Sequence, residues 1–263
     1  VLLFSERQVT ELLESIDKND GVYRFHLRGL KLDRMRNKTS VDSDATMIML
    51  QVRYPDGRGG KIYKPWSYYS DGKWRMMEPD DKLPFYKPQH KTAAVKIMLH
   101  EGPKAAQAAQ TIADEYHKGS FTHPWARELS SYEHWGIIGG ALATHRSDYS
   151  ELIDEKASEV IYMCDNDDLG KKSVSTVSRL YGKKMSVIQF DERWRNAWDI
   201  ADPLPEDFFK ESQYIGPTLN SLIHPATWAT KEIPNPEGRR KLYDLTDAFL
   251  ETWAFSIKPM LFI

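Results

Sequence analysis

The sequence predicts an α/β protein, in which a mainly parallel sheet flanked by helices follows a small antiparallel β-rich module and precedes a linker and C-terminal helix. Three observations predict this order. Apolar runs alternate with helix-like stretches from residue 94 to 190, strand-like segments separated by turn signals fill residues 47–77, and a proline-rich stretch precedes the last apolar segment. We therefore divide the chain into residues 1–92, 93–205 and 206–263.

The first division is expected to hold a helix and three strands. Apolar residues recur at helical spacing from Glu6 to Ile16, and a polar connection follows as far as Ser43. Pro-Asp-Gly and Ser-Asp-Gly turn signals indicate antiparallel hairpins. The expected strands are Met47 to Tyr54, Lys61 to Pro65 and Lys73 to Met77.

The second division alternates strands and helices, which is typical of parallel strands joined by crossover helices. The expected strands are 94–99, 135–138, 159–164 and 184–190, and the expected helices are 103–116, 148–156 and 169–181. Beyond Asp202 the chain reads as a loop and a linker, and a final apolar helix is expected from about Arg239 to Phe255.

Two acidic motifs stand where predicted strands end. They read His100-Glu101-Gly102-Pro103-Lys104 and Asp165-Asn166-Asp167-Asp168-Leu169-Gly170. In open α/β sheets, ligands bind outside the carboxyl ends of the strands. Residues i and i+2 at a strand end point the same way, so the first and third residues of the second motif aim at one spot.

If the two strands are neighbours, Glu101, Asp165 and Asp167 converge, while Asn166 points away. The mutual repulsion of three carboxylates favours a hard divalent cation, with Mg²⁺ as the first choice. Gly102 and Gly170 suit the same site, because a residue without Cβ permits a sharp turn and close approach of a phosphate or metal.

Glu101-Gly102 followed by Asp165-x-Asp167-x-x-Gly170 resembles the Toprim domain of primases, topoisomerases and some nucleases, over about residues 94–202. Within that family, the chain resembles phage- and plasmid-type primases, whose first motif commonly reads Glu-Gly-x-Lys-x-Ala. Lys104 and Ala106 match this motif, but Pro103 stands where many relatives place a second acidic residue. The segments that add to the resemblance are Gln51 to Gly57, Lys61 to Lys64, Gly72 to Trp74, Gly139-Gly140-Ala141 and Trp198 to Asp202.

The resemblance implies a Toprim-like fold and a DNA primase, a nucleotidyltransferase that makes short RNA primers on single-stranded DNA from nucleoside triphosphates. It implies Mg²⁺ or Mn²⁺ held by Glu101, Asp165 and Asp167, in a phage or plasmid replication protein that works with a replicative helicase in cis or in trans. Glu101 is implied as a metal ligand or a general base. Asp199 and Asp202 are implied as secondary acidic residues, or belong to a solvated loop.

Two other functions remain open. The same carboxylates would serve a metal-dependent Toprim nuclease that uses water as its nucleophile, and a non-catalytic Toprim module would bind DNA or bridge replication proteins. The acidic residues also have a simpler interpretation as helix caps, since Asp and Glu favour helix N-termini. We expect that capping role for Asp168.

Nucleic-acid contact is expected to be local, because the formal net charge is −2 and the isoelectric point is about 6.5. Candidate basic residues among aromatic side chains are Arg53, Lys61, Lys64 and Lys73. Lys104, on the first turn of a helix, is expected to meet a phosphate or solvent. An equally good interpretation of the first four is that they are solvated charges over a small aromatic core.

Composition excludes several classes. One cysteine, Cys164, rules out a disulfide framework and a cysteine-based zinc ribbon within this chain. Gly170-Lys171-Lys172-Ser173 ends like a phosphate-binding loop but lacks the glycine required five residues earlier. No apolar run approaches the roughly 20 residues of a membrane span, so we expect no membrane partner and a cytoplasmic protein in a bacterial or virus-infected host cell.

Overall fold

The structure, a computed structural model, describes part of the chain. The described residues are 12, 21–26, 47–55, 61–68, 73–78, 82–88, 96–120 and 122–226. The C-terminal helix expected at 239–255 lies outside this part, and of the helix expected at 6–16 only Leu12, which is helical, lies within it. Within the described part, no helix is long and apolar enough to cross a membrane.

The first sheet along the chain has four antiparallel strands. Its strands are adjacent in the order β1 (Gly21–His26), β2 (Met47–Pro55), β3 (Lys61–Tyr68) and β4 (Trp74–Arg75). The last three confirm the predicted antiparallel module. We did not expect β1, because its six residues lie in a stretch interpreted as a polar connection and the residues that pair in β1 and β2 are more than 20 positions apart in the sequence.

A second sheet of five strands confirms the predicted α/β class. Its order is β11-β8-β7-β5-β6, and all neighbouring strands run parallel except β11, which pairs antiparallel with β8 at the edge. The strands are β5 (Lys96–His100), β6 (Glu133–Gly136), β7 (Glu159–Met163), β8 (Ser186–Ile188) and β11 (Ile223–Pro225). The strand predicted at 135–138 therefore starts and ends two residues too late, and β11 was not predicted.

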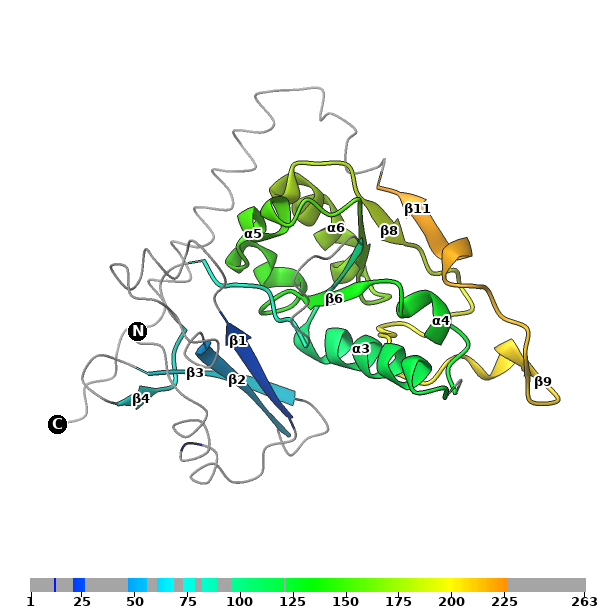
Figure 1. Cartoon of the computed structure of the whole chain (residues 1–263), viewed down its shortest axis with the longest axis horizontal. Coiled ribbons are helices and arrows are strands. Elements are labelled where there is room, and N and C mark those ends of the chain that lie inside the picture. Colours follow the sequence, from blue (N-terminus) through cyan, green and yellow to red (C-terminus); the bar gives the residue numbers. More distant parts are fainter. Residues whose placement is uncertain are drawn as a thin grey trace. The chain divides into compact units, whose positions relative to one another are not determined.

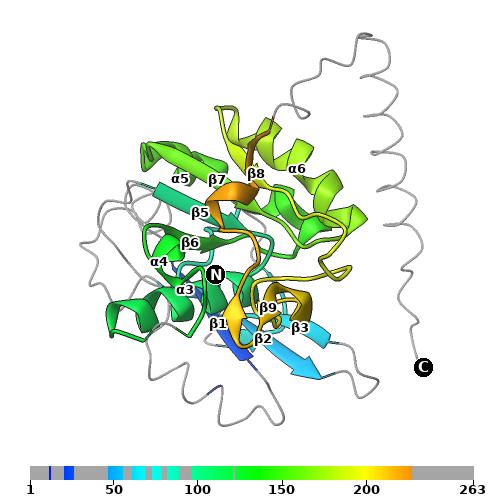
Figure 2. The ribbon, with the colours of Figure 1, turned by 90° about the vertical axis from the view of Figure 1, so that its right-hand side faces the viewer.

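Helices cover both faces of this sheet (Figures 1 and 2). The helices α3 (Pro103–His117) and α4 (Ala126–Leu129) lie on one face, and α5 (Tyr149–Asp154) and α6 (Asp168–Tyr181) lie on the other. Alternate residues of β5 point to opposite faces of the sheet, each of which has its own buried cluster. Ile97 packs with α5 and α6 on one face, and Met98 packs with α3 and α4 on the other. Shorter elements are η2 (Ala141–Arg146), η3 (Glu206–Phe208), β9 (Phe209–Lys210), β10 (Gln213–Tyr214) and η4 (Asn220–Leu222).

This α/β core reaches beyond the predicted borders at residues 93 and 205. On the N-terminal side, Phe85 is buried against Trp135 and Tyr149, and Tyr86 exchanges backbone hydrogen bonds of 2.8 and 2.9 Å with Gly136 at the end of β6. The buried Lys87 ammonium forms an ion pair with Glu151. On the C-terminal side, the residues buried in the core are Phe208, Leu219, Leu222 and Ala226.

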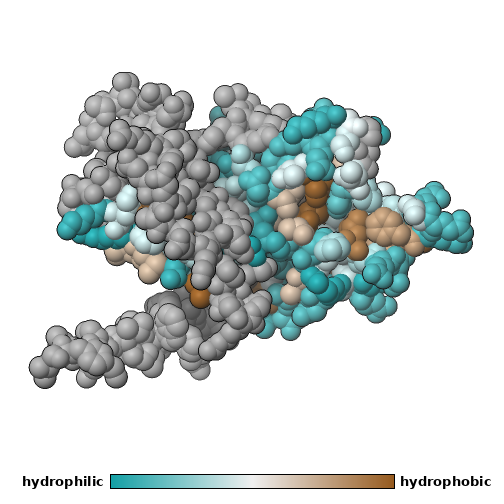
Figure 3. Space-filling model, turned by 90° about the horizontal axis from the view of Figure 1, so that it is seen from below, coloured by the Kyte–Doolittle hydropathy of each residue, from teal (hydrophilic) through white to brown (hydrophobic). Residues whose placement is uncertain are grey.

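The surface seen from below is mostly hydrophilic, and hydrophobic residues gather in a hollowed area among the described elements (Figure 3). Four aliphatic or aromatic residues of the α/β core are substantially exposed: Leu142, Leu169, Phe209 and Ile215.

Candidate functional site

The two acidic motifs meet where the direction of chain winding changes. His100, the last residue of β5, pairs with Gly136 of β6 and with Met163 of β7, so these strands end at one level. The chain leaves β5 for α3 on one face of the sheet and leaves β7 for α6 on the other. Such a topological switch point opens a crevice at the carboxyl ends of the strands, which is where open α/β sheets bind ligands.

Glu101 joins three loops at this edge. Its carboxylate Oε1 accepts a hydrogen bond from the Ala141 N–H at 3.2 Å, and Oε2 accepts one from the Asp165 N–H at 3.2 Å. Only 8% of the residue is exposed. Burial raises the pKa of Glu101, the Asp165 N–H opposes this shift, and the charges of Asp167 and Asp199 add to it. The structure thus brings the two predicted motifs together.

Asp165 differs from its neighbours because its carboxyl group accepts no hydrogen bond from the residues that the structure describes. Burial, followed by the charges of Glu101, Asp199 and Asp167, raises its pKa to about 8, while Lys104 opposes the shift. A partly buried carboxyl group among other acids is costly to ionise unless a cation compensates it.

Asp167 has a structural role as well as a place in the acidic cluster. Its Oδ1 accepts a hydrogen bond from the Gly170 N–H at 2.7 Å and caps α6. Asp168, which we expected to be the cap, is the first helical residue and is exposed. Because the Asp167 charge raises the pKa of both Glu101 and Asp165, the three predicted carboxylates do share one electrostatic environment.

Lys104 meets a carboxylate rather than solvent. Its ammonium lies 2.8 Å from Oδ2 and 3.1 Å from Oδ1 of Asp199, and both residues are partly buried. Asp202 accepts a hydrogen bond from the Asp199 N–H at 3.1 Å and pairs with the Arg195 guanidinium at 2.7 Å. Although burial opposes ionisation, these two contacts lower the pKa of Asp202. Asp199 and Asp202, the predicted secondary acidic residues, therefore belong to a hydrogen-bonded loop beside the acidic cluster.

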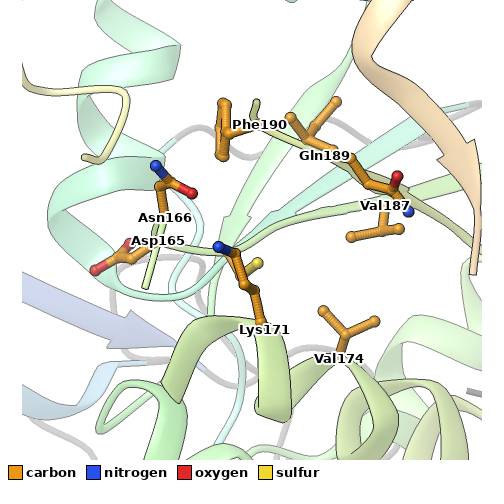
Figure 4. Close-up of a pocket in the computed structure, with 9 residues that line it drawn as sticks. Asp165, Asn166, Lys171, Val174, Val187, Gln189 and Phe190 are labelled. Carbon is orange, nitrogen blue, oxygen red and sulfur yellow. The ribbon is translucent and has the colours of Figure 1, made fainter. Parts of the chain in front are cut away.

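Asn166 anchors that loop. Its side chain points away from the Asp165 carboxyl group (Figure 4). The side-chain Nδ2 donates hydrogen bonds to the carbonyl oxygens of Trp194 at 3.2 Å and Arg195 at 3.0 Å. Its backbone N–H donates to the Trp198 carbonyl at 3.0 Å, and its own carbonyl accepts from Ala197. The predicted direction of this side chain is confirmed, and the reason is the loop of residues 194–198.

Replacing Asn166 with Asp is expected to lower the free energy of unfolding by about 2 kcal/mol, because it removes two donors and faces two carbonyl oxygens with a carboxylate. Urea unfolding at pH 7 would measure the loss. The Asp168→Asn protein is a suitable control, since that exposed side chain caps nothing. An unchanged midpoint for Asn166→Asp would contradict the anchoring role.

The predicted glycines differ in what they do. At Gly170 an added Cβ would lie 2.3 Å from the Asp165 carbonyl oxygen and 2.9 Å from Glu101 Oε2, so close approach requires glycine. Gly139 and Gly140 have φ values of +76° and +71°, which favour glycine. Gly102 lies in the bend between β5 and α3, but its φ of −150° is extended and a Cβ there would meet no atom within 4 Å, so neither the backbone conformation nor the space requires glycine.

The basic candidates of the antiparallel sheet do not form one surface. Arg53 pairs with Tyr63, and Lys64, the next residue along β3, projects from the opposite face of the sheet. The Lys64 ammonium lies 5.3 Å from the centre of the Tyr54 ring. Lys73 is exposed just before β4, and the side chain of Lys61 lies outside the described part.

The acidic cluster has the chemistry of a hard-cation site, since all its donors are carboxylate oxygens. Among the described residues, no three His, Cys, Asp or Glu side chains are arranged as a finished set of metal ligands. The uncompensated Asp165 carboxyl group is the feature that fits a cation, and Glu101 and Asp167 lie beside it with lone pairs that their hydrogen bonds leave free.

Sequence reasoning missed the residues at the end of β8. Gln189 and Phe190 follow that strand and, with Lys171 of α6, line a cavity that Asp165 also borders. We considered Lys171 only as part of an incomplete phosphate-binding loop. The usable signal was position, because residues just past a third parallel strand meet the same sheet edge as the two acidic motifs.

An α/β fold with a mostly parallel sheet and an acidic site at its switch point is thus the class of protein that the chain represents. No protein-family model and no curated protein matches it. Solved structures that match include bacteriophage T7 lagging-strand DNA polymerase interacting with primase domains bound to an RNA/DNA hybrid and dTTP. The identity is 16%, the match covers 66% of this chain and 86% of that chain, and the TM-score is 0.35.

A second match is the primase fragment of the bacteriophage T7 primase-helicase protein, with 18% identity and a TM-score of 0.35. It covers 56% of this chain and 54% of that chain, so the present chain spans about half the length of that fragment.

Proposed function

We propose that the chain is a primase-type nucleotidyltransferase of the Toprim class, which joins nucleoside triphosphates into short RNA primers on single-stranded DNA with Mg²⁺ or Mn²⁺. The resemblance of its two acidic motifs to that family and the meeting of these motifs at the switch point support the proposal. A replicative helicase in cis or in trans is part of the same proposal.

The observation that carries the proposal is the state of Asp165. Its carboxyl group is partly buried, accepts no hydrogen bond from the described residues, and has a pKa raised to about 8 by burial and by three other acids. A structural carboxylate would be hydrogen-bonded or paired. A carboxylate whose partner is a divalent cation has the properties seen here.

In this proposal Glu101, Asp165 and Asp167 hold the cation, and Asp199 orients Lys104 beside them. The bound ion would supply charge stabilisation for the reacting phosphate and lower the pKa of the attacking hydroxyl group. Glu101 keeps its position through the N–H groups of Ala141 and Asp165, which also fix the loops relative to one another. Lys104, at 2.8 Å from Asp199, places a positive charge at the edge where the phosphates would lie.

The experiment that tests the function is labelled-nucleotide incorporation by the intact chain on single-stranded DNA, with Mg²⁺, Mn²⁺ or EDTA, and with template length scored in the same reactions. Short labelled products that require the metal are expected. Metal-dependent shortening of the template without labelled products would replace the proposal with a nuclease. If neither activity appears even with a helicase added, a non-catalytic DNA-binding module is the better interpretation.

A further inference from the structure

A cavity of about 300 Å³ lies beside the acidic cluster, between the ends of β7 and β8 and the first turns of α6 (Figure 4). Its size is at the lower end of the range for ligand-binding pockets. Val174 and Val187 form an apolar wall, and Phe190 lies across the cavity from them. Asp165 borders the cavity, but its carboxyl group projects away from Val174 and Val187 (Figure 4).

The Phe190 ring is held in place. Its centre lies 5.0 Å from that of Trp194 and 5.1 Å from that of Trp198, and both tryptophans are buried. A ring fixed in this way presents an apolar surface without losing side-chain entropy when a ligand binds. Flat aromatic ligands stack on such surfaces.

Two polar side chains of the cavity are available to a ligand. Gln189 and Lys171 are exposed, and their side chains make no hydrogen bond or ion pair with the described residues. Gln189 carries an amide donor and acceptor side by side at the end opposite Asp165, and the Lys171 ammonium points toward Asp165 and Asn166 (Figure 4). Along the cavity, the Gln189 amide is therefore followed by the apolar surfaces of Val187, Val174 and Phe190, and then by the Lys171 ammonium group near Asp165.

This sequence of groups matches a nucleotide. A base combines flat apolar faces with an edge of paired donors and acceptors, which amide side chains recognise. Phosphates pair with an ammonium group and, through a cation, with carboxylates. We propose that the cavity holds the base of a nucleoside triphosphate, with Gln189 at the base edge, Phe190 against its face, and Lys171 directing the phosphates to the acidic cluster. The inference rests on the proposed function, because it assigns the substrate of that site.

Equilibrium dialysis tests the inference without requiring catalysis. Each of ATP, GTP, CTP and UTP is compared with inorganic triphosphate, in Ca²⁺, on the intact chain and on its Gln189→Leu variant. The base is expected to strengthen binding of at least one nucleotide about tenfold over inorganic triphosphate. Gln189→Leu should remove most of that advantage and leave the affinity for inorganic triphosphate unchanged. Lys172→Ala, which alters an exposed neighbour of Lys171 outside the cavity, is the matched control.

The same binding measurements on a Phe190→Leu variant test the second contact with the base. The melting temperature of this variant shows whether it is folded. The cavity is not a base site if nucleotides bind no better than inorganic triphosphate, or if both variants still bind nucleotides as much more tightly than inorganic triphosphate as the parent does. Either result would leave the proposed function unaffected. If no triphosphate binds to the chain at all, the proposed function fails together with this inference.

Discussion

The Asp165→Asn protein is expected to lose metal-dependent nucleotide incorporation by about a thousandfold, which corresponds to the several kcal/mol that a catalytic metal contributes. Asn keeps the size of the side chain but cannot carry a negative charge, and it replaces one carboxylate oxygen with an NH2 group. The Asp165 carboxyl group accepts no hydrogen bond from the described residues, so the exchange breaks no hydrogen bond in that part of the structure. Initial rates with saturating Mg²⁺ would measure the loss.

The same protein is expected to be more stable than its parent when metal is removed with EDTA. Because the pKa of Asp165 is raised to about 8 in the folded protein and is about 4 when unfolded, the protonated carboxyl group stabilises the fold only at low pH. That contribution is lost as the pH rises from about 4 to about 8. The Asn side chain cannot ionise, so the variant does not lose this stability. The melting temperature of Asp165→Asn should equal that of the parent near pH 4 and exceed it most near pH 8.

The control is Asp168→Asn, which removes an exposed charge three residues away. It should change neither the rate nor the pH dependence of stability appreciably. If Asp165→Asn kept full activity, or were less stable than its parent at pH 8 without metal, Asp165 would be a structural residue and the proposed function would lose its main support.

Gly170→Ala is expected to destabilise the protein by more than about 3 kcal/mol and to abolish activity. In an ordinary helix this exchange would add up to about 1 kcal/mol of stability, because alanine is the better helix former. Here the new Cβ would lie 2.3 Å from the Asp165 carbonyl oxygen and 2.9 Å from Glu101 Oε2, so α6 or the acidic loop must shift. Urea unfolding measures the stability.

Gly102→Ala is the matched control, since a Cβ there meets no atom within 4 Å and the backbone is extended. Its unfolding midpoint should stay close to that of the parent. Equal stability of the two variants would show that α6 does not approach the acidic loop as closely as the structure has it.

Much of the α/β fold could be predicted because strong apolar runs mark β5 and β7, and helical spacing marks α3 and α6. The strand β6 was misplaced by two residues because the apolar run that ends in Ile137 and Ile138 continues into a buried loop. Its true start includes Glu133 and His134, which are polar yet buried. Hydropathy alone does not reveal such residues.

Some residues of the candidate site could likewise be predicted from the sequence, and others could not. Glu101, Asp165 and Asp167 could be found because each belongs to a short local motif at a strand end. The ion pair between Lys104 and Asp199 joins residues 95 positions apart, and no local pattern predicts it. The exchange of capping roles between Asp167 and Asp168 turns on where α6 begins, which sequence patterns fix only to within a few residues.

The segment that closes β6 bears on how the chain can be divided in the laboratory. Tyr86 occupies the outer edge of β6 through two backbone hydrogen bonds, and Lys87 neutralises Glu151. A fragment that starts at residue 93 would lose both, so its β6 would offer unpaired N–H and C=O groups to other molecules and its Glu151 would lose its cation. Aggregation of such a fragment would reflect where it was cut, and a fragment that begins before residue 82 keeps the pairing of Tyr86 with Gly136 and the ion pair of Lys87 with Glu151.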